Sequence, residues 1–202
     1  MELPFNTHTS TPAPEGAHPG RLVRIVDLGS QVTPFAHEDG SPVVSRKLQI
    51  SWELYCDRMP DGRPFVVSEK YTRSLNEKSG LYKLLAGWLG KEWDEALAKG
   101  GFNFASLLGR ACLVTVNHRQ SKQGRTFAKL GAVTVLPKGL KPDEQVNPSL
   151  LFDLDKPNRG VLDQLPGWVQ EEVGKSPEWK AHTGMYVHAN EPEGPEDQSV
   201  PF

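Results

Sequence analysis

The sequence predicts a mainly β protein, a small Greek-key barrel of five strands with helices inserted between the third and fourth strands. Two observations support this fold class. Apolar and polar residues alternate in segments before residue 73 and after residue 110, and the apolar spacing between these regions changes to that of a helix. Clusters of Gly, Pro and Asp separate the segments, as is typical of turns between strands.

The clearest strand is predicted over residues 46–56. Apolar side chains occupy one of its faces: Leu48, Ile50, Trp52, Leu54 and Cys56. More polar side chains occupy the face that we expect to point outward: Lys47, Gln49, Ser51, Glu53 and Tyr55. Leu22–Leu28 is predicted as the first strand. Phe65–Thr72 is predicted as the third, joined to the second in a hairpin by the Asp61-Gly62 turn.

Ser79 is the predicted N-cap of a helix, because four large apolar residues follow it at helical spacing. These residues are Leu81, Leu84, Leu85 and Trp88. A second short helix is predicted over Trp93–Ala98, and Asn103 caps a further turn. The fourth and fifth strands are predicted over Ala111–His118 and Thr126–Leu136, with a basic loop between them. Three strands, a helix and two strands is the order of the OB-fold, so we expect an OB-like barrel.

The composition divides the chain into four parts. Residues 1–19 are rich in Pro, Ser and Thr and are expected to form a disordered arm. Residues 20–140 hold the predicted barrel. Residues 141–189 are interpreted as an extension that packs on the barrel, with a short helix near residues 167–174 bound through Trp168 and Val173. Residues 190–202 are expected to form an acidic, disordered tail.

Charge is distributed unevenly along the chain, although the formal net charge is only −2. Residues 20–140 carry 18 Lys and Arg against 11 Asp and Glu, a net charge of +7. Residues 141–202 carry 5 against 12, a net charge of −7. A basic body with an acidic end is typical of a protein that binds polyanions and whose tail competes with them or seeks a partner.

The sequence favours a cytoplasmic protein. No apolar run approaches the roughly 18 residues that a membrane-spanning helix needs, and the N-terminus lacks the apolar stretch of a secretory signal. The two cysteines, Cys56 and Cys112, lie far apart in strand-like segments and are interpreted as reduced thiols of the core.

Single-stranded nucleic acid is bound by cations that follow the phosphates and by aromatic rings that stack on bases. In OB-folds, the second and third strands and the loop between strands four and five commonly line the binding groove. The candidate nucleic-acid-binding residues on these elements are Lys47, Gln49, Tyr55, Lys70, Tyr71, Arg73, Arg119, Lys122, Arg125, Phe127 and Lys129. Trp52 alternates with core residues and is assigned to the core.

Signals for catalysis are weak. The sequence has no phosphate-binding Gly-x-x-x-x-Gly-Lys motif and no dinucleotide-binding glycine pattern. We therefore expect no enzymatic activity, no catalytic residues, no metal and no cofactor. Asp153, Asp155 and His118 could serve a nuclease, but the two aspartates alternate with apolar residues as in a short edge strand.

The C-terminus combines acids with an apolar tip, in the residues Glu196, Asp197, Val200, Pro201 and Phe202. It resembles the tail of bacterial single-stranded DNA-binding proteins, which end in an acidic run, an aliphatic residue, Pro and Phe. The resemblance implies that the tip recruits replication or repair proteins. Gln198 and Ser199 stand where that family has acids, so weaker recruitment is expected.

Three further segments resemble a family of single-stranded DNA-binding proteins from phage and prophage replication or recombination regions: residues 49–54, 70–75 and 107–113. The resemblance implies an OB-like protein that coats single-stranded DNA in the host cytoplasm, and it supplies no site residues. Two alternatives remain open at this point. One is a phage interaction module that acts on host replication or a host nuclease through Phe202. The other is a nuclease or a nuclease accessory subunit. The oligomeric state is open too, and a homo-oligomer could form through an exposed strand edge.

Overall fold

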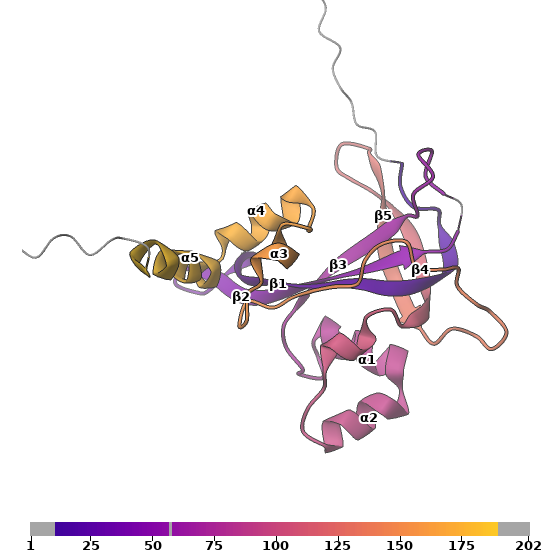
Figure 1. The fold of residues 1–202 in the computed structure, drawn as a ribbon, viewed down its shortest axis with the longest axis horizontal. Coiled ribbons are helices and arrows are strands. Elements are labelled where there is room, and N and C mark those ends of the chain that lie inside the picture. Colours follow the sequence, from indigo (N-terminus) through magenta and orange to yellow (C-terminus); the bar gives the residue numbers. More distant parts are fainter. Residues whose placement is uncertain (1–10, 57, 190–202) are drawn as a thin grey trace, which may run out of the picture.

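The computed structural model describes residues 11–56 and 58–189 (Figure 1). The strands are β1 (Gly16–Ala36), β2 (Pro42–Leu54), β3 (Val66–Thr72), β4 (Ala111–Gln120), β5 (Thr126–Thr134) and β6 (Leu150–Phe152). The helices are α1 (Gly80–Leu89), α2 (Lys91–Ala98), the 3₁₀ helix η1 (Phe104–Leu107), α3 (Arg159–Leu162), α4 (Gly167–Lys175) and α5 (Pro177–Ala189).

The strands form one mixed sheet in the order β3-β2-β1-β4-β5, in which all neighbours are antiparallel. β1 is long enough to have three partners. Its first residues pair with β4, residues 20–36 pair with β2, and Arg24–Val26 pairs in parallel with β6. The predicted hairpin of the second and third strands is confirmed.

The sheet stays open, so the expectation of a closed barrel is wrong. β3 and β5 are its two edges, and no ladder joins them among the described residues. Helix α1 packs against both edge strands. A pocket lined by both strands and by Thr11–Ala13 lies where a closing ladder would begin. The fold class is accordingly mixed α/β rather than mainly β, because helices cover both faces of the sheet.

Two apolar cores lie on opposite faces of the sheet. The larger core joins β2 and β4 to helices α1 and α2, and includes Ile50, Trp52, Leu85, Trp88, Trp93 and Val116. The smaller core joins β1 and β6 to helices α3 and α4, and includes Val26, Leu28, Phe152, Leu162, Val169 and Val173. In Figure 1, α1 and α2 accordingly lie below the sheet, α3 and α4 lie above it, and α5 lies beside its left end.

Local predictions about helix ends hold. The Ser79 hydroxyl accepts a hydrogen bond from the Tyr82 backbone N–H at 3.1 Å and caps α1. The Asn103 side chain accepts one from the Ala105 N–H at 3.0 Å and caps η1. Trp52 is fully buried, as expected for a core residue.

Other expectations need correction. β1 begins at Gly16, and Ala13 is buried in the larger core, so residues 11–19 are not a disordered arm. Of the two residues expected to anchor α4, Val173 is buried as predicted, but Trp168 is 53% exposed and Val169 takes its place in the core. The short edge strand expected around Asp153 and Asp155 is present as β6 but ends at Phe152, and α3 and α5 were not predicted.

Candidate nucleic-acid interface

The β4–β5 hairpin carries a group of exposed cations around one exposed aromatic ring. Its turn is closed by hydrogen bonds from the Ser121 N–H to the Arg125 carbonyl and from the Gly124 N–H to the Ser121 carbonyl, both 2.9 Å long. Gly124 has a φ of 78°, a left-handed conformation that glycine adopts without strain. The tight turn therefore fixes the positions of the side chains at the tip and on the adjoining strands.

The register of the hairpin places Arg119, Phe127 and Lys129 on one face. Arg119 pairs with Phe127, and Asn117 pairs with Lys129. Paired residues of antiparallel strands point to the same face. The opposite face carries Val116 and Leu130, which are buried in the core. Phe127 is 43% exposed, so its ring is available to stack on a partner.

We call the exposed group at this hairpin the hairpin surface; it comprises Arg119, Lys122, Arg125, Phe127 and Lys129. Its four cations form no ion pair with any other residue that the structure describes. Their positive charge is thus not neutralised within the described part of the chain, which favours binding of an anion.

A pocket of about 550 Å³, the seam pocket, opens between the first residues of β3 and those of β5. Lining residues that bear on binding are Arg63, Phe65, Ser68, Arg125, Thr126 and Phe127. Arg125 and Phe127 belong also to the hairpin surface, so the two sites are continuous.

The polar face of β2 does not form an open groove, and this corrects the prediction for Gln49. Gln49, Ser51 and Glu53 are almost fully buried. Glu53 explains the burial: its carboxylate accepts hydrogen bonds from the Val146 N–H at 2.9 Å and the Asn147 N–H at 2.7 Å, so the extension covers this face. Gln49 is therefore not accessible to a nucleic acid.

Tyr55 and Tyr71, two of the predicted stacking residues, are partly buried. The hydroxyl oxygen of Tyr55 is buried, and burial together with the charge of Glu53 raises the pKa of Tyr55 to about 12. Tyr71 packs against the larger core, and burial raises the pKa of its phenol well above the usual value. Neither ring presents the open face that Phe127 presents.

The predicted cations on β2 and β3 are engaged within the protein. Lys70 forms an ion pair with Glu172 of α4 at 2.5 Å. Lys47 donates a hydrogen bond to the Thr72 hydroxyl at 2.8 Å. Both ammonium groups therefore already have a partner within the protein.

Arg73 and Arg46 share two aspartates. Arg73 contacts Asp27 at 2.9 Å and Asp155 at 3.0 Å, and Arg46 contacts the same two carboxylates at 2.5 and 2.7 Å. The hydrogen bond from Arg46 lowers the pKa of Asp155 below its usual value, and Arg73 adds to the effect. Because Asp27 is buried, this network joins β1, β2 and the segment after β6 in a structural contact.

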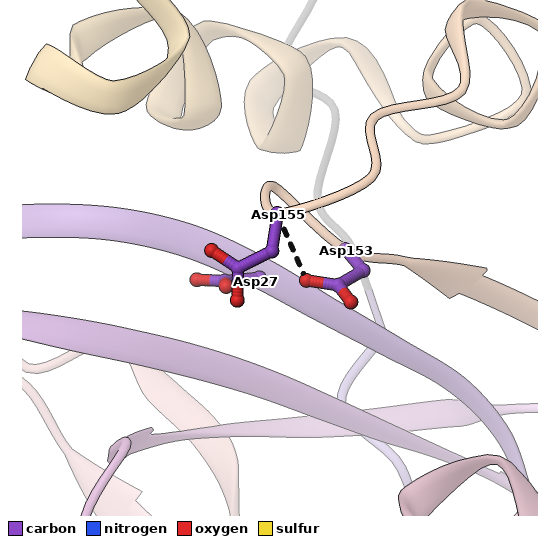
Figure 2. Close-up of side chains that lie close together, drawn as sticks. All are labelled: Asp27, Asp153 and Asp155. Atoms are coloured by element: carbon purple, nitrogen blue, oxygen red, sulfur yellow. Dashed lines mark hydrogen bonds between the residues drawn. The ribbon is translucent and has the colours of Figure 1, made fainter.

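Three carboxylates lie close enough to bind a cation: Asp27, Asp153 and Asp155 (Figure 2). Asp153 also accepts a hydrogen bond from the Asp155 backbone N–H at 3.0 Å, which closes a tight turn. Two arginines already neutralise Asp27 and Asp155, so the positive charge that a metal would supply is present as side chains. This arrangement explains the cluster without a metal ion.

His118, the other residue considered for catalysis, contacts the segment that precedes β1. Its Nε2 lies 2.8 Å from the Ala13 carbonyl oxygen, and its backbone N–H donates to the Glu15 carboxylate at 3.1 Å. The residue therefore helps to hold the N-terminal segment against β4.

Sequence reasoning missed Arg63 and Phe65, of which the first follows the predicted Asp61-Gly62 turn and the second begins the third predicted strand. The signal that could have identified these two residues is the strand order of the predicted fold. The predicted fold brings the third and fifth strands to neighbouring edges, so the residues before β3 meet those at the start of β5. The tail residues Glu196, Asp197, Val200, Pro201 and Phe202 lie outside the described residues.

No helix among the described residues is long and apolar enough to cross a membrane. No protein-family model matches the chain, and no curated protein was found to be similar to it.

Proposed function

We propose that this chain is a single-stranded DNA-binding protein without catalytic activity and that the hairpin surface is its principal binding site. The observation that carries the proposal is a group of four exposed cations, which form no ion pair with any described residue, around the exposed ring of Phe127. Cations neutralise phosphates and release counterions, and an aromatic face stacks on any base. Binding of this kind is strong at low salt and nearly independent of sequence.

Phe127 favours a single strand over a duplex. Bases in a duplex are already stacked on one another, whereas a single strand can turn a base toward the ring. Arg119 pairs directly with Phe127 across the hairpin, and Lys129 lies two residues further along the same face. A phosphate can therefore contact a cation while the attached base contacts the ring.

The strand order supports an OB-type architecture that is open at one seam. Joining β3 to β5 would turn the observed order into the circular order of an OB barrel. The outer face of β2 is buried beneath the extension, and Lys70 and Arg73 already pair with acids. We therefore propose that the DNA follows the β4–β5 hairpin rather than the face of β2 and β3.

The wider role follows from the resemblances of the sequence. We propose that the protein coats single-stranded DNA during phage replication or recombination in the host cytoplasm. The tail ending in Phe202 would recruit a replication or repair protein. The nuclease alternative has less support, because arginines already neutralise Asp27 and Asp155.

Fluorescence anisotropy with labelled oligo-dT and a matched duplex, repeated across salt concentrations, tests the proposal. The wild type should bind the single strand more tightly than the duplex. Reversing three cations together, with Arg119→Glu, Lys122→Glu and Arg125→Glu, should greatly weaken binding. Loss of three phosphate contacts should also reduce the log–log salt slope by about 2, since each contact on a single strand contributes about 0.7.

The matched control reverses three exposed lysines of the helical insert, with Lys78→Glu, Lys83→Glu and Lys91→Glu. Both triple variants change the net charge equally. Greater loss in the hairpin variant assigns binding to that surface, and equal loss would mean that only overall charge matters. A wild type that binds neither oligonucleotide at low salt would refute the proposed function.

A further inference from the structure

We infer that the seam pocket receives one unstacked base of a single strand whose phosphates lie on the hairpin surface. This inference rests on the proposed function and specifies a subsite for it. Arg125 and Phe127 connect the two sites, because both line the pocket and both belong to the hairpin surface. A strand bound by the hairpin cations therefore lies at the mouth of the pocket.

The lining suits the chemistry of a nucleobase. A base has apolar faces and a polar edge, so it needs an apolar wall and a few hydrogen-bonding groups. Phe65, which is only 6% exposed, supplies a wall together with apolar residues of β3, and Ser68 and Asn147 supply polar groups. The backbone N–H and side-chain amide of Asn147 donate to Glu53, which fixes this residue in place.

The charge and the volume of the seam pocket agree with a nucleobase as its occupant. Among the residues that the structure describes, no Asp or Glu lines the pocket, and two of the lining residues are arginines. Arg63 is already paired with Asp61 at 2.6 Å, whereas Arg125 forms no ion pair with any described residue and is available to a phosphate. The volume of about 550 Å³ falls within the usual range for small-molecule pockets, about 300–1,000 Å³, so a base with part of its sugar fits.

The pocket lies at the seam where the sheet is open. In a closed barrel, backbone hydrogen bonds between β3 and β5 would fill this space. Here the first residues of both strands line it together with Thr11–Ala13. The open seam thus provides depth next to cations, which the flat outer face of a closed barrel would not provide.

The test fills the pocket without removing a charge. Thr126 is exposed and lines the pocket, so Thr126→Trp should occupy part of its volume. Thr134→Trp is the matched control, because Thr134 is exposed on the same strand but does not line the pocket. Each protein is titrated with an oligo-dT of about 12 nucleotides, within the usual site size of an OB-fold, and with an abasic oligonucleotide of equal length.

Thr126→Trp should weaken binding of oligo-dT by about 5- to 150-fold, the range that corresponds to one lost stacked base. Its affinity for the abasic strand, which offers phosphates alone, should stay within about 2-fold of the wild type, as should that of Thr134→Trp for both strands. Equal loss on both strands would overturn the inference, because it would indicate a disturbed fold or phosphate path. Unchanged binding of oligo-dT by Thr126→Trp would also overturn it while leaving the proposed function intact. If the wild type does not bind oligo-dT, the proposed function itself is refuted, and not only the role of the pocket.

Discussion

Replacing Glu53 with Gln tests how the extension is held on the sheet. Glu53 is fully buried, and its Oε2 accepts from the Asn147 N–H at 2.7 Å and from the Asn147 side-chain amide at 2.6 Å. Its Oε1 accepts from the Val146 N–H at 2.9 Å. A Gln side chain can keep its oxygen at the Oε2 position, but its amide group then faces the Val146 N–H, donor against donor.

The loss of stability expected for Glu53→Gln follows from these hydrogen bonds. A hydrogen bond to a charged group contributes about 1.5–3 kcal/mol net, and a buried donor left without a partner costs about 1–3 kcal/mol. Val146 is 59% exposed, so its N–H can regain water by a small shift, and this favours the lower end. We therefore expect Glu53→Gln to lower the free energy of unfolding by about 2 kcal/mol.

Urea unfolding followed by circular dichroism measures this change, and a thermal scan should show a midpoint lower by about 4–8 °C. Hydrogen exchange at residues 146 and 147 should speed up as well. Glu95→Gln is the control, because Glu95 is exposed on α2 and its replacement should change stability by less than about 0.5 kcal/mol. A Glu53→Gln variant as stable as this control would refute the view that Glu53 holds the extension in place.

Two further predictions concern α5 and the arginine–aspartate network. Gly29 has a φ of 71°, and an added Cβ would lie 2.5 Å from the Cβ of Ser176, so Gly29→Ala should destabilise the fold by more than about 2 kcal/mol in urea unfolding. Gly62→Ala, with a similar φ and open space around it, should cost only about 1 kcal/mol, and equal losses would contradict the packing argument. The folded state holds the pKa of Asp155 below the ordinary 3.8 through its hydrogen bond from Arg46, so this stabilisation is complete above that pH and is lost as the pH falls below it. Stability should consequently fall less steeply below about pH 4 in Asp155→Asn than in the wild type, and identical acid profiles would count against the interaction.

Local features of the fold could be predicted because short-range physics sets them. The caps at Ser79 and Asn103 depend on side chains that bond within three residues. The apolar face of β2, including Trp52, follows from its alternation. The exposed cations of the β4–β5 hairpin also followed from sequence, because a polar turn between two strands lies at the surface.

What the sequence could not determine was which faces and edges are covered. The polar face of β2 resembles a solvent-exposed face, yet Glu53 is buried by residues more than 90 positions later. The tertiary structure likewise decided that Lys70 pairs with Glu172 and that the seam between β3 and β5 stays open. Alternation reports only which residues of a strand share a face. Whether that face meets water or protein depends on where distant segments pack, and no local pattern records this.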